Sequence, residues 1–203
     1  MIVYLHGLNS AGTSGKAAVL RERLAPVEIY SPTYPAQSAA LAVETLGQAL
    51  GQLLQASLST EPRLLVGSSM GGFYGAWLAR HLGFQHLVMI NPALRPWELL
   101  RQVVGWQYNE AQDERYYLSA EMVAATQDYA TAPDGIGSPL TLLLDEGDEL
   151  IDSRQTAADC RGLAEVHLFE GGSHGFEHMD EAVGIIGGIH RSLARDMSAN
   201  KHQ

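Results

Sequence analysis

Residues 63–82 read Arg-Leu-Leu-Val-Gly-Ser-Ser-Met-Gly-Gly-Phe-Tyr-Gly-Ala-Trp-Leu-Ala-Arg-His-Leu, and this stretch decides the fold. Its first part, Arg63 to Val66, is a short apolar run that predicts a buried strand. Its last part, Met70 to Leu82, contains Ala76, Leu78 and Ala79, which favour a helix. Between them, Gly67-Ser68-Ser69-Met70-Gly71 matches the pattern G-x-S-x-G, in which a serine occupies a sharp turn between a strand and a helix.

Ser69 occupies the serine position of that pattern. Ser68 precedes it by one residue and is expected to pack in the turn. The flanking glycines are needed because a Cβ there would collide with the neighbouring strand or helix. A glycine-rich turn of this kind also occurs in nucleotide-binding units, but the G-x-G-x-x-G and Walker-lysine patterns are absent from it. We therefore predict that Ser69 is an exposed nucleophile.

The rest of the chain alternates short apolar runs with longer helical patterns. Six runs predict strands, at Ile2 to Leu5, Val27 to Tyr30, Arg63 to Val66, His86 to Ile90, Leu140 to Leu144 and Val166 to Phe169. Most lack polar alternation, as strands buried on both faces do. Helices are predicted at Lys16 to Leu24, Ser38 to Gln55, Met70 to Leu82, Ser153 to Cys160 and Met179 to Ala194. This alternation predicts an α/β fold with a mostly parallel sheet of about six strands flanked by helices.

One stretch departs from this alternation, because no strand is evident between Pro92 and Pro139. A structureless loop of that length is improbable in a compact domain, so we predict a few short helices there. They would form a small helical cap over the sheet, at about residues 93–132, within a single domain of residues 1–203. Its aromatic residues are candidates for lining a pocket, although packing onto the sheet is the commoner role. They are Trp97, Trp106, Tyr108, Tyr116, Tyr117 and Tyr129.

A serine nucleophile needs a base and an acid, which in this type of fold follow it in the order serine, acid, histidine. His174 lies in a glycine-rich loop directly after the last predicted strand, where it can reach the serine, so we predict that it is the base. We predict Asp148 as the acid because it follows the glycine turn after the preceding strand. Asp145, at the end of that strand, is the alternative, and Asp152 is expected to cap the next helix.

His174-Gly175-Phe176-Glu177-His178 also fits the zinc-peptidase pattern H-x-x-E-H. That pattern requires a helix that places both histidines on one face, whereas Gly171, Gly172 and Gly175 favour a loop. No third ligand is evident in the sequence. We expect no metal and no cofactor, and we expect His178 to start the last helix.

The oxyanion formed when a serine attacks a carbonyl group needs two backbone N–H donors. We predict that one is the N–H of Met70, the residue after the nucleophile. The other should come from the loop after the first strand, His6-Gly7-Leu8-Asn9-Ser10, and by position we predict the N–H of Leu8. His6 is expected to orient this loop through hydrogen bonds, since its place in the chain order excludes it as the base.

The composition narrows the possible partners. Asp and Glu outnumber Lys and Arg by 23 to 13 in 203 residues, a net charge of −10, so nucleic acid is not expected as a partner. The single cysteine, Cys160, excludes an internal disulfide and is expected to be a packed apolar side chain. No run reaches the roughly 18 apolar residues of a membrane span, and no signal peptide is visible. We expect a cytoplasmic protein.

Several motifs together resemble the YqiA/YcfP family of bacterial α/β-hydrolases over nearly the whole chain. They are Tyr4-Leu5-His6-Gly7-Leu8-Asn9-Ser10, Gly67-Ser68-Ser69-Met70-Gly71-Gly72-Phe73-Tyr74, Asn91-Pro92-Ala93, Gly147-Asp148-Glu149 and Gly171-Gly172-Ser173-His174. The resemblance implies a compact α/β-hydrolase fold and esterase activity, with acyl-CoA thioesters among the substrates. It also implies Ser69, Asp148 and His174 as the catalytic triad.

The expected function is hydrolysis of a small-molecule carboxylic ester or acyl thioester through an acyl-enzyme on Ser69. Two alternatives stay open at this point. Acyl transfer would use the same triad with an alcohol or amine in place of water. A non-catalytic binding module would keep the fold without the chemistry. The sequence specifies neither the substrate nor the oligomeric state.

Overall fold

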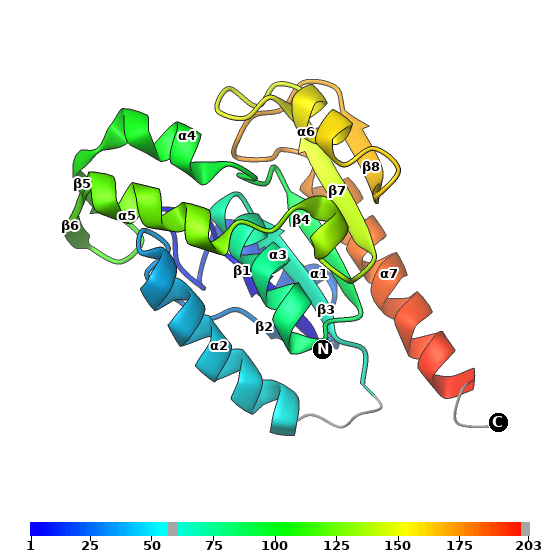
Figure 1. The fold of residues 1–203 in the computed structure, drawn as a ribbon. Coiled ribbons are helices and arrows are strands. Elements are labelled where there is room, and N and C mark those ends of the chain that lie inside the picture. The colour runs from blue at the N-terminus through cyan, green and yellow to red at the C-terminus, as the bar shows by residue number, and fades with distance from the viewer. Residues whose placement is uncertain (57–60, 200–203) are drawn as a thin grey trace.

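Six parallel strands form one sheet in the order β2-β1-β3-β4-β7-β8. The computed structural model describes residues 1–56 and 61–199 (Figure 1). The strands are β1 (Ile2–Leu5), β2 (Ile29–Tyr30), β3 (Leu64–Ser68), β4 (His86–Ile90), β7 (Leu140–Asp145) and β8 (Ala164–Phe169). The predicted parallel sheet is confirmed. Only β2 is shorter than predicted, because the Val27 N–H bonds back to Leu24 O and cannot join the ladder.

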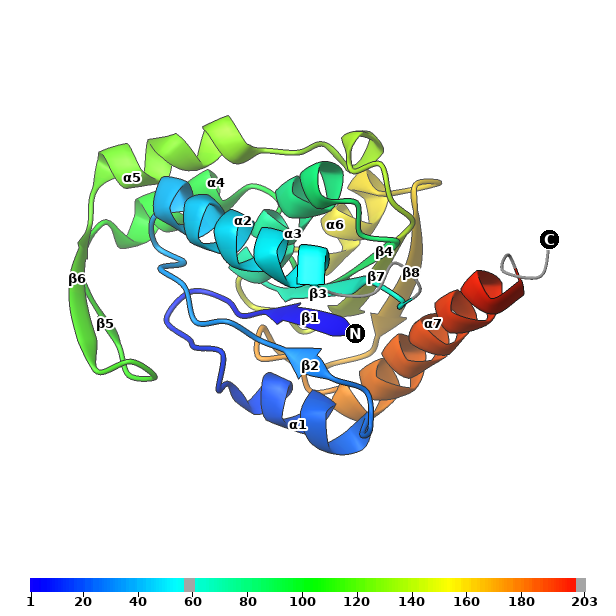
Figure 2. The same ribbon diagram turned by 90° about the horizontal axis from the view of Figure 1, so that it is seen from below.

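Helices cover both faces of the sheet (Figure 2). One face packs against α1 (Gly15–Arg23) and α7 (Met179–Ala199). The opposite face packs against α2 (Ala39–Ala56), α3 (Met70–Leu82) and α6 (Ser153–Asp159). All five helices lie where the sequence predicts them, and α7 continues five residues beyond its predicted end at Ala194.

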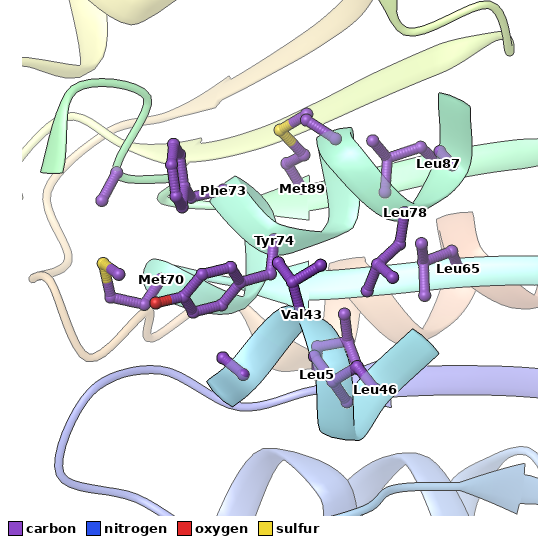
Figure 3. Close-up of a cluster of buried hydrophobic side chains, with 14 of the residues drawn as sticks. Leu5, Val43, Leu46, Leu65, Met70, Phe73, Tyr74, Leu78, Leu87 and Met89 are labelled. Atoms are coloured by element: carbon purple, nitrogen blue, oxygen red, sulfur yellow. The ribbon is translucent and has the colours of Figure 1, made fainter. Parts of the chain in front are cut away.

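Successive residues of each central strand point to opposite faces, so one strand contributes to two cores. In β3, Leu65 packs under α2 and α3, whereas Leu64 and Val66 face α1 and α7. Figure 3 shows Leu46 of α2 beside Leu5 of β1, with α3 above β1 and β3. Each such fully buried aliphatic side chain contributes about 1.5–3 kcal/mol relative to exposure. This packing fixes the strand ends from which the site is built.

The segment between β4 and β7 contains the predicted short helices, and it also contains a β-hairpin that the sequence did not indicate. Strands β5 (Gly105–Asn109) and β6 (Glu114–Leu118) pair antiparallel and project from one end of the molecule (Figure 2). The hairpin is flanked by short helical segments. These are α4 (Pro96–Leu100), η1 (Arg101–Val103), α5 (Ala120–Ala125), η2 (Thr126–Tyr129) and η3 (Pro133–Gly135). We call this segment, residues 93–139, the insertion.

The strand order reverses direction at β1, whose neighbours are β2 on one side and β3 on the other. In open parallel sheets, ligands bind outside the carboxyl ends of the strands at such a switch point. The loop after β1 and the turn after β3 meet there. The loops after β7 and β8 leave from the same edge of the sheet, since all six strands are parallel.

Candidate active site

Ser69 stands in a strained turn at the end of β3. Its backbone angles are φ 53° and ψ −118°, in a region that non-glycine residues rarely adopt. Its N–H donates to Ile90 O of β4 at 3.0 Å, which ties the turn to the sheet. A Cβ on Gly71 would lie 2.1 Å from Leu5 O, and one on Gly67 would lie 2.2 Å from Gly71 O. The turn therefore requires both glycines, as the sequence pattern predicts.

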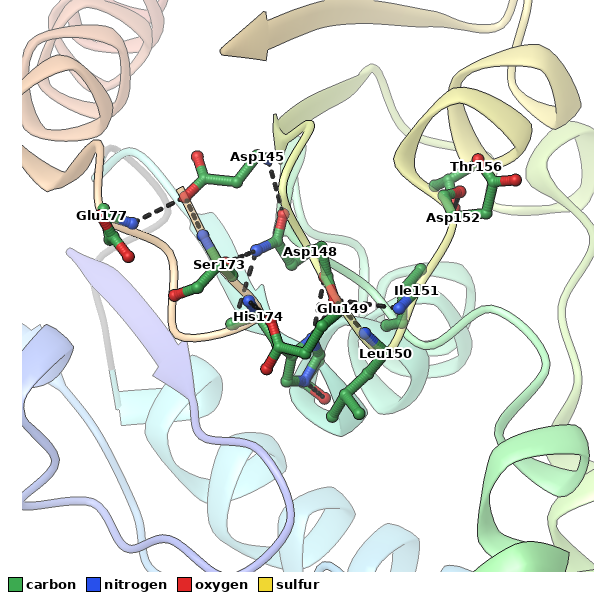
Figure 4. A network of polar contacts seen from close by, with 12 residues as sticks. Asp145, Asp148, Glu149, Leu150, Ile151, Asp152, Thr156, Ser173, His174 and Glu177 are labelled. Carbon is green, nitrogen blue, oxygen red and sulfur yellow. Dashed lines mark hydrogen bonds and ion pairs between the residues drawn. The ribbon is translucent and has the colours of Figure 1, made fainter. Parts of the chain in front are cut away.

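The structure brings Ser69, His174 and Asp148 into one hydrogen-bonded chain. His174 Nε2 lies 3.0 Å from Ser69 Oγ. The other ring nitrogen, Nδ1, lies 2.9 Å and 3.1 Å from the two carboxylate oxygens of Asp148. The Asp148 side chain is buried and its Oδ1 also accepts the N–H groups of Leu150 and Ile151, each at 2.9 Å (Figure 4). These bonds hold the carboxylate toward the imidazole.

Asp145, the alternative acid, contacts a different histidine. It is completely buried at the end of β7, and its Oδ1 lies 2.7 Å from Nδ1 of His178. Its Oδ2 accepts the N–H groups of Ser173 at 3.2 Å and Glu177 at 2.7 Å. Asp145 therefore holds the loop that carries His174 without touching the His174 ring. Asp152 caps α6 as predicted, with its carboxylate accepting the Gln155 N–H.

Residues 174–178 form a loop, so the zinc-peptidase pattern lacks the helix that it needs. Phe176 has φ 62°, and α7 begins at Met179, directly after His178. Gly172, at φ 73°, passes so close to Asp145 that a Cβ there would overlap its carboxylate. Within residues 1–56 and 61–199, no group of three or more His, Cys, Asp or Glu side chains could hold a metal ion.

Asn91 is a site residue that the sequence reasoning did not identify. It is buried at the end of β4 with φ 41°, and its side chain joins two loops. Its Oδ1 accepts the N–H of Asp145, and its Nδ2 donates to Ser173 O at 2.9 Å. Asn91 thus links the β7 end to the loop that holds His174. The Asn-Pro-Ala motif was visible, but nothing in its pattern indicates that the side chain reaches two distant loops.

The loop after β1 passes directly against the nucleophile. A Cβ on Gly7 would lie 3.2 Å from the Ser69 Cβ and 3.7 Å from its Oγ. Leu8 and Met70, the predicted oxyanion donors, line the same cavity as Ser69. The structure thus places both residues at the site, and their N–H groups remain the predicted donors.

His6 holds this loop from beneath, as predicted. Its Nδ1 donates to Gly7 O at 2.8 Å, and its Nε2 accepts the N–H of Tyr34 at 3.3 Å, an arrangement that fits the neutral ring. The ring stacks on Tyr34, with centroids 4.3 Å apart. Burial lowers the pKa of His6 below its ordinary value, which favours the neutral form.

The hairpin of the insertion holds the same loop from outside. The side-chain amides of Asn109 and Gln112 both donate to Ser10 O, at 3.2 Å and 2.9 Å. Asn9 adopts φ 52° and accepts a hydrogen bond from the Tyr116 hydroxyl. These supporting residues were not identified from the sequence, because the hairpin itself was not predicted.

A cavity of about 620 Å³ opens over Ser69 and His174. Its apolar lining includes Pro96, Leu99 and Leu100 of the insertion together with Leu150. None of the six predicted aromatic residues lines it. Trp106, Tyr108 and Tyr117 are instead exposed on the hairpin, where strand alternation turns them to solvent. The insertion does contribute to the cavity, but through aliphatic side chains.

Cys160 is buried, as predicted, and burial raises the pKa of its thiol to about 11. A thiol with that pKa is almost entirely protonated at neutral pH and is a poor nucleophile. Within the described part of the chain, no helix is both long and apolar enough to cross a bilayer.

A parallel sheet with a strained serine after one central strand and a histidine after the last is the arrangement of an α/β hydrolase. The chain has this fold. It belongs to the uncharacterised protein family UPF0227, which matches residues 1–187 and is the YqiA/YcfP family that its motifs resemble.

Solved structures with the same fold include several esterases and lipases. Est1E from Butyrivibrio proteoclasticus is 14% identical, with a TM-score of 0.72 over 95% of this chain and 87% of that one. The monoacylglycerol lipase of Paleococcus ferrophilus is 18% identical, with a TM-score of 0.70 over 95% and 94%. An esterase domain from Rhodothermus marinus is 14% identical, with a TM-score of 0.66 over 96% and 86%. At these identities the likeness is one of fold.

Proposed function

We propose that the protein is a serine esterase that hydrolyses small carboxylic esters or acyl thioesters through an acyl-enzyme on Ser69. The observation that carries the proposal is the continuous chain of hydrogen bonds from Ser69 through His174 to Asp148. A serine hydroxyl is a weak nucleophile alone and becomes effective beside an oriented base. Hydrolase activity also agrees with the esterases and lipases that share the fold.

Each group in this hydrogen-bonded chain has a role in the proposed mechanism. Nδ1 of His174 carries the proton that bonds to Asp148, so Nε2 is free to take the proton from Ser69 Oγ. The oxygen attacks the carbonyl carbon, and the tetrahedral intermediate places its negative charge toward the N–H groups of Leu8 and Met70. His174 then protonates the departing alcohol or thiol. Water, activated by the same imidazole, releases the acid and restores Ser69.

Aliphatic side chains on one wall of the cavity fit an acyl or alkyl group. Pro96, Leu99 and Leu100 come from the insertion, which we propose acts as a cap over the site. Binding sites for small organic molecules are commonly lined this way, with a few polar groups that fix orientation. The volume of about 620 Å³ accommodates a small molecule.

Labelling with a fluorophosphonate tests the proposal directly. The folded protein should acquire one adduct on Ser69, located by peptide mass spectrometry, and should hydrolyse short p-nitrophenyl esters. Ser69→Ala should lose both properties. Ser68→Ala is the matched control, because it removes the neighbouring hydroxyl at the end of β3 and should leave labelling of Ser69 intact. Absence of an adduct on folded wild-type protein would contradict the proposal and favour a non-catalytic binding module.

A further inference from the structure

Lys16 is one of two lysines in the chain, the other being Lys201. It lies in the first turn of α1, after the loop that passes Ser69, and its side chain is half-buried. It lines the same cavity as Ser69 and His174. The positive charge of Lys16 would therefore face a substrate that enters the cavity to reach Ser69.

The ammonium group of Lys16 makes no direct hydrogen bond or ion pair with any residue that the structure describes. Over residues 1–56 and 61–199, no ion pair or hydrogen bond joins it to another side chain or to the backbone. By contrast, Arg23, Arg95 and Arg154 each contact a carboxylate within 3 Å. The mechanism of ester hydrolysis gives Lys16 no role either, so its position in the cavity needs another explanation.

The surroundings of Lys16 disfavour a bare cation. Burial lowers the pKa of its ammonium group, and the carboxylate of Asp145 counteracts this only in part. Asp145 itself already accepts hydrogen bonds from Ser173, Glu177 and His178. A partly desolvated charge without a partner is unfavourable, and an incoming anion would remove that penalty.

The walls of the cavity differ in chemistry. The insertion contributes the apolar Pro96, Leu99 and Leu100, whereas the loop after β1 and the start of α1 contribute most of the polar side chains. These are Asn9, Ser10, Ser14 and Lys16, with Leu8 beside them. A substrate that spans the cavity would therefore place an apolar part against α4 and a polar part against α1. Because one cavity holds both Lys16 and Ser69, a single small molecule could present its polar part to Lys16 and its carbonyl group to Ser69.

We propose that Lys16 binds an anionic group of the substrate, so that the enzyme selects esters or thioesters bearing a carboxylate close to the scissile bond. This inference rests on the proposed esterase function and names the substrate class. The carboxylate belongs either to the acyl part, as in a half-ester of a dicarboxylic acid, or to the alcohol part, as in an ester of a hydroxy acid.

Two pairs of substrates distinguish a carboxylate on the acyl part from a carboxylate on the alcohol part. Monomethyl adipate and its neutral carboxamide analogue place the charge on the acyl side, and 3-acetoxybenzoate and 3-acetoxybenzamide place it on the alcohol side. In one pair, wild-type enzyme should favour the carboxylate, and Lys16→Met should lower the carboxylate-to-amide ratio of kcat/KM about tenfold. Lys16→Arg keeps the charge and should retain most of the ratio. Added salt should reduce it in wild type, because screening weakens partly exposed pairs.

Arg195→Met is the control for net charge, since Arg195 is exposed on α7 and lines no part of the cavity. It should leave both ratios unchanged. Equal ratios in wild type and Lys16→Met for both pairs, with the amides still hydrolysed, would overturn the role of Lys16 while leaving the esterase function intact.

A binding measurement decides the question independently of turnover. In Ser69→Ala protein, the carboxylate of at least one pair should slow modification of Lys16 by trinitrobenzenesulfonate, and the amide of that pair should not. Peptide mass spectrometry separates Lys16 from Lys201, which serves as the internal reference. Equal modification with carboxylate and amide in both pairs would refute the proposal, even if no ester tested is hydrolysed.

Discussion

The hydroxyl of Tyr116 donates a hydrogen bond of 2.7 Å to Oδ1 of Asn9, and so joins the hairpin of the insertion to the loop after β1. That loop passes against Ser69 and carries the proposed oxyanion donor Leu8. Asn109 and Gln112 add two hydrogen bonds to the neighbouring Ser10 carbonyl. The insertion therefore supports the site through polar contacts as well as by forming the apolar wall of the cavity.

Tyr116→Phe should lower kcat/KM for a p-nitrophenyl ester by about threefold to tenfold. The lost hydrogen bond has a net value of about 0.5–1.5 kcal/mol, and its loss frees the loop that must orient the oxyanion donor. Thermal unfolding should change little, because the hydroxyl lies at the surface. Tyr117→Phe, on the exposed side of the same strand, is the control. Equal losses in the two variants would contradict this role of Tyr116.

Asp148→Asn should lower kcat by about 10⁴ without unfolding the protein, as loss of this type of carboxylate does in serine proteases. The amide oxygen would still accept the hydrogen bonds from the N–H groups of Leu150 and Ile151. The NH₂ group would therefore face His174 Nδ1. The imidazole would then carry its proton on Nε2 and could not accept one from Ser69. Steady-state kinetics and circular dichroism test this. Activity within tenfold of wild type would exclude Asp148 as the acid.

Asp145→Asn should act mainly on stability. The buried carboxylate accepts from His178 and from two backbone N–H groups, and an amide offers only one oxygen for them. We expect the free energy of unfolding to fall by about 1.5–3 kcal/mol in urea denaturation. Asp152→Asn is the control, because asparagine caps a helix as well as aspartate and should change stability by less than about 0.5 kcal/mol. Similar losses in both variants would argue against the network around Asp145.

Gly71→Ala should destroy the turn that presents Ser69. The new Cβ would lie 2.1 Å from Leu5 O, a backbone atom that cannot move without shifting β1. We expect unfolding free energy to fall by about 3 kcal/mol or more and fluorophosphonate labelling to disappear. Gly47→Ala in α2 is the control, since nothing lies within 4 Å of its Cβ position. That change should stabilise the helix by about 0.5–1 kcal/mol.

Stability should depend on pH through His6. Burial lowers the pKa of His6 in the folded protein below its ordinary value of about 6.5. As pH falls below 6.5, the unfolded chain binds the proton first, so stability that is fully present above this pH is progressively lost. Urea unfolding at pH 7.5, 6.5 and 5.5 should show the advantage of wild type over His6→Asn shrinking toward low pH. A constant difference would mean that His6 is not held neutral.

The fold was predictable because its strands are buried on both faces. The runs at Ile2–Leu5 and His86–Ile90 contain no polar alternation that could assign them to an exposed sheet, and the structure reproduces their limits. The hairpin escaped prediction for the opposite reason. Trp106 and Tyr117 face solvent, and the turn between the strands lacks an Asn-Gly or Asp-Gly pair that signals a tight hairpin.

The candidate site was predictable where order along the chain restricts the choice. Only a histidine downstream of Ser69 and of an acid could serve, and His174 lies in a suitable loop. The choice between Asp145 and Asp148 depended on which side chain the turn at Gly147 directs toward His174. The path of the backbone through that turn cannot be predicted from the residue types alone. The bridging role of Asn91 depends on two loops that meet only in the folded chain.

Ser69 and His174 are 105 residues apart in the sequence, although their side chains lie within hydrogen-bond distance. During synthesis, the serine and its turn leave the ribosome long before the base and the acid exist. Until the last strand joins the sheet, Ser69 is an ordinary alcohol with no means of losing its proton. The proposed reactivity of Ser69 would therefore begin only after the loop that follows β8 has been synthesised and has joined the fold.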